Sequence, residues 1–305
     1  MKFLFSLLLL LALPVTCHAG APSSVDVPIL MYHKVCKDPA QIGKFAITPS
    51  ELARDLAFLA ESAYTPVVMA DLIAFVLDGT PLPERPVVLT FDDGFFSDHR
   101  YLLPLVLEHQ VPVVSSIIGQ VTDAYTSEGR TDILYPHVTW PQVAEMAASG
   151  LIEIQNHSYD LHCTRHGAKG AEQRTRECDT AYANRLQADL SLLQTRIQEQ
   201  IGTAPTTFTY PFGAKSACSD QVLQSLGFSA SLATEARVNT LTIGAPDCLF
   251  SLGRMIRPHG RDAETILGRL EASHRTVGCF RPHTTAQSSH GFRLQCPVAT
   301  YRPAL

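Results

Sequence analysis

VVLTFDDG, residues 87–94, is the stretch of sequence that decides the fold. Its first five residues form a continuous β-prone run, which is typical of a strand with both faces covered in a parallel sheet. Two carboxylates follow directly, and Gly94 allows the chain to turn sharply after them. The stretch therefore predicts a buried strand that ends in a charged loop.

Strand and helix patterns alternate on both sides of this stretch. Strands are expected at residues 27–32, 64–69, 111–118, 151–154 and 208–210. Helices are expected from Pro49 onward and at residues 70–77, 101–108, 140–149, 180–200 and 220–226. This alternation with short connections predicts an α/β domain with a parallel sheet, and the number of units favours a closed or nearly closed barrel over an open sheet.

The N-terminus is typical of a secretory signal peptide. Lys2 precedes an apolar run over residues 3–13, and small residues follow near residue 19. A buried helix, an uncleaved anchor and a lipid-modified Cys17 are the alternatives. We expect a signal peptide at 1–19, a short linker at 20–25, the catalytic domain at 26–273 and an irregular tail at 274–305. The mature chain is then expected to be extracytoplasmic, secreted or associated with the cell surface, with no membrane span.

Charge and cysteine content exclude some classes of function. The formal net charge is −5 and no block of like charges occurs, so nothing favours a nucleic-acid partner. Eight cysteines are present, and seven remain if Cys17 leaves with the signal. Cys163 and Cys178 bracket a polar insertion and are the pair we most expect to form a disulfide. No CxxC pair occurs, which disfavours a cysteine zinc site.

Asp92 and Asp93 stand together at the end of an apolar strand. Like charges this close raise the pKa of one carboxyl group unless a cation neutralises one of them. A bound metal would remove this repulsion, because one carboxylate can hold the cation while the other stays free as a base. The alternative is a turn without function.

His157 and His162 follow the expected strand at 151–154. Residues five apart diverge by about 140° on an α-helix, so the two imidazoles can converge only from a loop. With Asp93 they make a set of two histidines and one carboxylate that leaves positions open for water and substrate. Imidazoles suit zinc, cobalt, nickel or iron(II) better than magnesium or calcium. Two surface histidines without a role are the alternative.

A third segment, FTYPFG at residues 208–213, also lies at a strand end. Its proline and glycine shape a tight turn, and such a turn can direct a backbone N–H at a developing oxyanion. The N–H of Phe212 is the example we single out.

Taken together, these motifs resemble the polysaccharide deacetylases of carbohydrate esterase family 4, the NodB-homology domain. TFDDG at 90–94 matches its first motif in full, HSYDLH at 157–162 and YPFG at 210–213 resemble its second and third, and the resemblance covers roughly residues 26–270. The five-residue histidine spacing and PILMYH at 28–33 are similar to the branch of extracellular poly-N-acetylglucosamine deacetylases. The implied fold is a distorted (β/α) barrel with fewer than eight full repeats.

The resemblance also implies roles for individual residues. Asp92 would be the general base, Phe212 would help to hold the oxyanion, and the metal ligands would be Asp93, His157 and His162. The cofactor would be a divalent metal, with zinc expected and cobalt or nickel as alternatives. The implied reaction is hydrolysis of N-acetyl groups on an N-acetylhexosamine polysaccharide.

Departures from the family pattern leave two roles open. The usual arginine of the third motif is missing, and Arg254 or Arg257 could orient Asp92 instead. The late Leu-x-His motif that normally supplies the general acid is missing too, so the resemblance implies His33, with His259 and His283 as rivals. An inactive glycan-binding module and an acetyl-ester hydrolase on a plant polysaccharide are the alternative functions.

Overall fold

A curled parallel sheet forms the centre of the computed structural model, which describes residues 23–129, 136–165 and 167–277. Seven strands follow the order β12-β11-β8-β7-β6-β2-β14, and every neighbouring pair is parallel. Their bounds are β2 (Ile29–Tyr32), β6 (Pro86–Asp93), β7 (Val113–Ile117), β8 (Ile152–Asn156), β11 (Thr207–Thr209), β12 (Ala230–Leu232) and β14 (Met255–Ile256). The strand β5 (Thr65–Pro66) pairs with β6 beside this path.

The two edges of this sheet approach each other near Leu252. The N–H of Ala233, just after β12, donates to the carbonyl of Leu252, and the N–H of Leu252 donates to Ser231, both at 2.8 Å. A parallel bridge joins Leu232 to Leu252, three residues before β14 begins. The fold is thus an incomplete, distorted barrel, which confirms the expected fold class.

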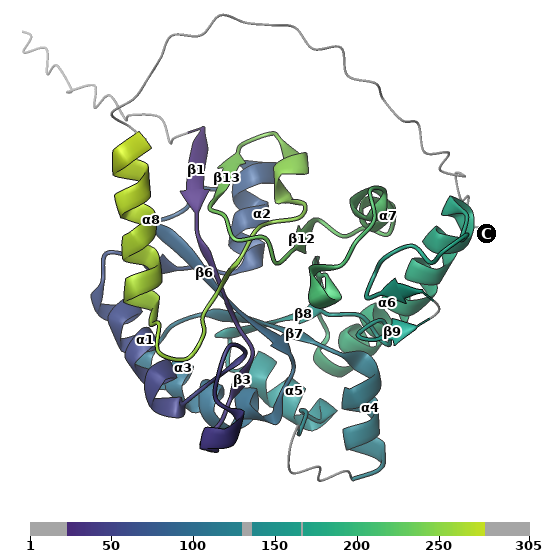
Figure 1. Ribbon diagram of the computed structural model, residues 1–305, viewed down its shortest axis with the longest axis horizontal. Helices are drawn as coiled ribbons and strands as arrows, with labels where there is room; N and C mark the ends of the chain where they lie inside the picture. The colour runs from purple at the N-terminus through teal and green to yellow at the C-terminus, as the bar shows by residue number, and fades with distance from the viewer. Residues whose placement is uncertain (1–22, 130–135, 166, 278–305) are drawn as a thin grey trace, which may run out of the picture.

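Helices surround this sheet (Figure 1). Helix α1 contacts both α8 and α3, and a second series of contacts links α4 to α5, α5 to α6 and α6 to α7. Their bounds are α1 (Pro49–Glu61), α2 (Met69–Asp78), α3 (Leu103–His109), α4 (Gly119–Ser127), α5 (Trp140–Ala148), α6 (Asp179–Ile201), α7 (Ser219–Ser225) and α8 (Ala263–Val277). The short helical turns are η1 (Pro39–Gln41), η2 (Asp98–Leu102), η3 (Pro211–Gly213) and η4 (Pro246–Leu249). The remaining short strands are β1 (Ser24–Val27), β3 (Lys34–Val35), β4 (Ala46–Ile47), β9 (Thr164–Arg165), β10 (Ala168–Lys169) and β13 (Asn239–Thr242).

Local chemistry explains why the central elements form where they do. All eight residues of β6 are buried, as its apolar sequence predicts. Helix α1 begins with Pro49 and a capping box in which Thr48 and Glu51 bond each other's backbone N–H groups. Helices α2 and α6 end at Gly79 and Gly202, which adopt the left-handed conformation that favours glycine. These signals set where the helices begin and end.

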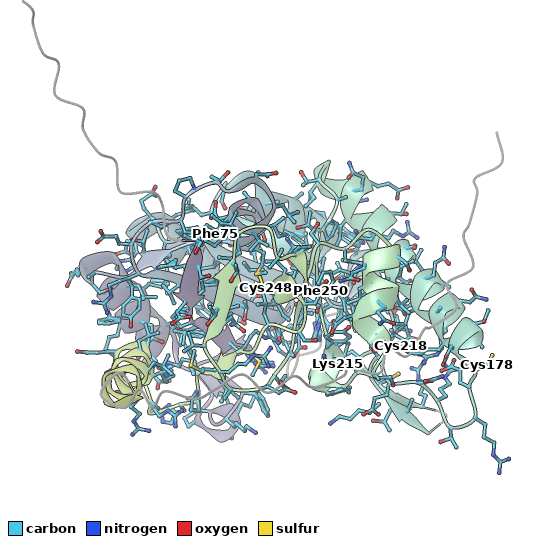
Figure 2. The ribbon with its side chains drawn as sticks, turned by 90° about the horizontal axis from the view of Figure 1, so that it is seen from above. Phe75, Cys178, Lys215, Cys218, Cys248 and Phe250 are labelled. Atoms are coloured by element: carbon cyan, nitrogen blue, oxygen red, sulfur yellow. The ribbon has the colours of Figure 1, made fainter. Side chains whose placement is uncertain are left out.

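The structure corrects three expectations. The strand expected at 64–69 is reduced to β5, because helix α2 already begins at Met69. Cys163 and Cys178 are free thiols instead of a disulfide, and so are Cys36 and Cys248. Figure 2 shows Cys178 at one end of the molecule and Cys248 near its middle. Helix α8 continues to Val277, past the start of the expected tail.

The expected signal peptide at 1–19 and most of the expected tail lie outside the described residues, and so does His283. Within the described residues, no helix has the length and apolar character that crossing a membrane requires.

Candidate metal centre and active site

Three predicted metal ligands converge at the carboxyl ends of two strands. Asp93 ends β6, His157 follows β8, and His162 comes from the loop after it. The Oδ1 atom of Asp93 lies 3.3 Å from Nε2 of His157 and 3.2 Å from Nε2 of His162. One ligand atom from each residue lies within 4.8 Å of the others, so a single divalent cation could contact all three.

The hydrogen bonds of His157 fix which nitrogen faces this point. Its Nδ1 lies 2.8 Å from the carbonyl oxygen of Thr209, which can only accept, so Nδ1 carries the proton. The neutral ring then presents the lone pair of Nε2 to Asp93, the form in which imidazole binds a metal. Oδ1 of Asp93 is buried and accepts no hydrogen bond from the described residues. These donors fit a divalent metal of the zinc, cobalt or nickel class.

The electrostatics favour the required protonation states at Asp93 and His162. At His157 burial lowers the pKa, but the contact with Asp93 and the charge of Asp92 raise it above its ordinary value. Burial alone would raise the pKa of Asp93, but His157, His33 and His162 lower it, and the net pKa is well below the usual range. Burial and the neighbouring His157 lower the pKa of His162 to about 4. At neutral pH the site therefore offers an ionised carboxylate and a neutral His162 imidazole.

Asp92 has a different partner from Asp93. The guanidinium of Arg254 donates two parallel hydrogen bonds of 2.7 Å to its carboxylate, and a third to the hydroxyl of Thr90. Both charged side chains are almost fully buried. Burial raises the pKa of Asp92 but Arg254 lowers it, with the net result below the ordinary value. Asp92 is thus held as an oriented carboxylate, the state a general base needs.

Of the two arginines considered as partners for Asp92, Arg254 is the one in contact. Arg257 is bonded instead to Asp55 and Glu51 of helix α1. Sequence order could not separate them, since they lie three residues apart and far along the chain from Asp92. Arg254 immediately precedes β14, which spans Met255–Ile256, and Arg257 immediately follows it.

His33 lies at the end of β2 and lines the same pocket as the metal ligands. Its Nε2 is 3.9 Å from Oδ2 of Asp92, and its Nδ1 is buried without a hydrogen-bond partner among the described residues. Burial lowers the pKa of His33, although both aspartates oppose this. The rival His259 is half-exposed and contacts Glu51, away from the pocket.

Three residues that are not glycine adopt left-handed backbone conformations around the site. The φ angles are 76° at Asp93, 73° at Ser158 and 60° at Phe212. Such conformations cost about 1–3 kcal/mol each and tend to gather where function requires them. After Asp93 the chain turns at Gly94, where a Cβ would lie 2.9 Å from Cγ2 of Ile117, so only glycine fits.

Phe212 contributes its ring as well as its backbone. The ring centroid of Phe212 lies 4.2 Å from that of His162, and Phe212 is 41% exposed to solvent. Sequence reasoning singled out the N–H of Phe212 and missed the ring. The sequence could not show this contact, because it depends on how the η3 turn and the loop carrying His162 pack against each other in the folded chain.

All predicted site residues line one open pocket of about 760 Å³. It contains Asp92, Asp93, His33, His157, His162 and Phe212, together with Arg254, Phe45, Tyr210 and several lysines. The pocket lies at the end of the sheet where the strands finish, the usual position of active sites in barrels of this kind.

Asp189 of helix α6 supports the histidine loop and was not anticipated. Its two carboxylate oxygens accept the backbone N–H groups of Tyr159 and Asp160, both at 2.8 Å. These residues lie between His157 and His162. A carboxylate that holds two consecutive amides thus fixes the loop from which His162 reaches Asp93.

Comparison with known proteins agrees with this geometry. The polysaccharide deacetylase family model matches residues 79–231, which is half of the chain. Poly-beta-1,6-N-acetyl-D-glucosamine N-deacetylase of Escherichia coli (strain K12) is 27% identical over 218 residues, which are 65% of this chain and 32% of that protein. The chain thus spans about a third of the length of this relative.

Solved structures of similar proteins include a de-N-acetylase from Aggregatibacter actinomycetemcomitans. It is 25% identical with a TM-score of 0.67, and the match covers 80% of this chain and 99% of that one. IcaB from Ammonifex degensii is 25% identical with a TM-score of 0.62 over 76% of this chain and 91% of that one. Since the family model matches half of the chain, and the matched region carries both aspartates, the two histidines and the η3 turn, this chain belongs to the polysaccharide deacetylase family.

Proposed function

We propose that this protein is a metal-dependent N-deacetylase that removes acetyl groups from N-acetylhexosamine residues of an extracytoplasmic polysaccharide. The observation that carries the proposal is the convergence of Asp93, His157 and His162 beside a carboxylate, Asp92, that is free to act as a base. The names of the E. coli relative and of the A. actinomycetemcomitans structure support N-acetyl groups over other acyl groups.

In this proposal Asp93, His157 and His162 hold a divalent metal, for which zinc is the first choice and cobalt or nickel are alternatives. When bound, such an ion polarises an acetamide carbonyl and makes a water easier to deprotonate. This binding needs neutral imidazoles at His157 and His162 and an ionised carboxylate at Asp93, so metal binding releases any proton that His157 carries at Nε2.

The remaining steps belong to the side chains around the metal ligands. Asp92, oriented by Arg254, takes a proton from the attacking water. The N–H of Phe212 donates to the oxygen that becomes negative as the carbonyl carbon turns tetrahedral. His33 donates a proton to the leaving amine, so that acetate and a free amine are released.

His33 is well placed to act as the acid, but in the free protein it does not carry the proton that this role requires. Burial lowers the pKa of His33, so its ring is neutral at pH 7 before substrate binds. It must therefore gain its proton during the reaction, and Asp92, 3.9 Å away, is the nearest carboxylate that could pass one on. Negative charge developing on the substrate favours the protonated ring.

The location of the reaction rests on the apolar N-terminal run. A signal peptide at 1–19 would bring the chain to the polysaccharide outside the cytoplasm. A reporter fusion to residues 1–25, compared with a fusion in which Leu8 to Leu10 are replaced by Asp, tests export directly. Export of the first fusion and retention of the second is the expected result.

The substrate proposal is tested by acetate release from a small panel of glycans. The panel contains β-1,6- and β-1,4-linked N-acetylglucosamine oligomers and acetylated xylan, each with added zinc, cobalt or nickel. We expect acetate from at least one N-acetylglucosamine oligomer and at least tenfold less from xylan. Release from xylan alone would identify an ester hydrolase. No release from any glycan, with binding retained, would identify an inactive glycan-binding module.

A further inference from the structure

Two lysines border the pocket, each next to an exposed phenylalanine. The ammonium of Lys44 lies 5.0 Å from the ring centroid of Phe45, and that of Lys169 lies 4.9 Å from the ring centroid of Phe212. Phe45 is 50% exposed and Phe212 is 41% exposed, and both line the pocket. These two Lys–Phe pairs keep their charges at the pocket mouth through cation–π contacts.

The two pairs approach the metal centre from opposite directions. The ring of Phe45 lies 4.9 Å from that of His33, which follows β2. The ring of Phe212 lies 4.2 Å from that of His162, which follows β8. In the sheet, β2 lies on one side of β6 and β8 on the other, so the lysines flank the end of β6 where the aspartates stand.

The charge of the pocket lining is positive. Four basic side chains line it, namely Lys34, Lys44, Lys169 and Arg254, against the two carboxylates of Asp92 and Asp93. Arg254 already neutralises Asp92, and a divalent metal at Asp93 would add more positive charge. The ammonium groups of Lys44 and Lys169 make no ion pair with a carboxylate among the described residues.

Acidic residues close to the mouth are engaged elsewhere. The carboxylate of Glu172 accepts the backbone N–H of Lys169 at 3.0 Å, and that of Asp160 is paired with Arg165 at 2.7 Å. Glu235 is paired with Arg237 at 2.7 Å. The two ion pairs offset the charges of Asp160 and Glu235, whereas Glu172 keeps its negative charge while bonded to the backbone of Lys169.

From this arrangement we propose that Lys44 and Lys169 are specificity-determining residues that disfavour a glucosamine next to the reacting N-acetylglucosamine. The inference rests on the proposed deacetylation. A deacetylated sugar carries an ammonium group at or below neutral pH, and two fixed lysine charges repel it, whereas an acetamide is neutral. The site therefore favours fully acetylated stretches, and successive cuts on one glycan are spaced apart.

The test compares two pentamers of N-acetylglucosamine at pH 6.5, one fully acetylated and one with a single glucosamine at its second position. The wild type, a Lys44→Gln/Lys169→Gln variant and a charge-retaining Lys44→Arg/Lys169→Arg variant are each assayed for kcat/KM. A Lys37→Gln variant is the matched control, since Lys37 is exposed beside Tyr101 and does not line the pocket.

For the wild type at 10 mM salt we expect kcat/KM to be on the order of tenfold higher for the fully acetylated pentamer. The preference should shrink at 150 mM salt, because the Debye length falls from about 30 to about 8 Å. The Gln double variant should show a ratio near one, while the Arg double variant and Lys37→Gln keep the wild-type ratio.

Two failures can be told apart. If the wild type releases acetate from both pentamers with equal kcat/KM, or if the Gln double variant keeps the wild-type preference, the lysine proposal is wrong and deacetylation stands. If the wild type releases no acetate from either pentamer with metal present, the proposed function fails and the lysine proposal falls with it.

Discussion

Asp92 and Asp93 are neighbours in the chain, but their carboxylates face different partners. Asp93 faces the Nε2 atoms of two imidazoles, and Asp92 faces the guanidinium of Arg254. The left-handed conformation of Asp93, with φ of 76°, separates the directions of the two side chains. One carboxylate is therefore placed to hold a cation while the other stays available for a proton.

This difference predicts opposite defects in two variants. Asp92→Asn should keep one metal per chain and lose turnover by about 10²–10⁴-fold, because the base is removed and the ligands remain. His157→Ala should lose the metal as well as the activity. Metal content by mass spectrometry beside acetate release distinguishes them. A fully active Asp92→Asn variant would show that the base is assigned wrongly.

Arg254 sets the protonation of Asp92 and so the acidic limb of the pH–rate profile. Replacing Arg254 by Met leaves the burial that raises the pKa of Asp92 and removes the charge that lowers it. The acidic limb of kcat/KM should then move up by about 1–3 pH units. Arg254→Lys, which keeps the charge and loses the two parallel bonds, should move it less. An unchanged limb in the Met variant would exclude this role.

At the level of single residues, the sequence predicted the aspartates, the histidines and the Phe212 turn because these lie in short motifs beside strand ends. Arg254 and Arg257 remained alternative partners for Asp92, since Asp92 is 162 positions away from Arg254 in the chain. Lys44, Lys169 and Phe45 gave no signal, because isolated basic and aromatic residues in loops are common in any chain.

Among the elements, the loop between His157 and His162 depends on helix α6 for its shape. Asp189 of that helix accepts two consecutive backbone N–H groups of the loop. Burial raises the pKa of Asp189 to about 6. The ordinary aspartate value is about 3.9, so the folded chain binds its proton more tightly than the unfolded chain does.

Between about pH 4 and pH 6 the folded state therefore holds the extra proton, and this residue makes the free energy of unfolding fall as the pH rises. Asp189→Asn removes that dependence. The free energy of unfolding of the variant minus that of the wild type should be about 1–3 kcal/mol larger at pH 7 than at pH 4. Urea denaturation at both pH values measures it, with the exposed Glu199→Gln as control. If the difference in unfolding free energy between Asp189→Asn and the wild type is the same at both pH values, Asp189 does not have the raised pKa described above.

Long elements were predicted well, and short ones were not. Helices α1, α5 and α6 carry helical apolar spacing with clear start or stop residues, and β6 is a continuous apolar run. Strands β12 and β14 have three and two residues, too few for any period to show. Their positions depend on pairing with other strands of the sheet. The segments beside β12 and β14 bring the two edges of the sheet together, and Arg254 lies directly before β14.

On the scale of the whole molecule, the alternation of strands and helices predicted the barrel, and the sheet order explains why its site is composite. Residues after β2, β6, β8 and β11 meet at one end because parallel strands finish there together. The pocket thus combines the three predicted metal ligands, the predicted base with its arginine and two Lys–Phe pairs from separate parts of the chain.

The central claim is that Asp93, His157 and His162 hold a metal that deacetylation requires. Its most direct test measures acetate released from an N-acetylglucosamine oligomer by the full chain, first stripped by a chelator and then reloaded with one equivalent of zinc, cobalt or nickel. We predict that stripping abolishes release and that one equivalent of at least one of these metals per chain restores it in the wild type but not in His157→Ala. Unchanged release by the stripped protein would contradict the claim.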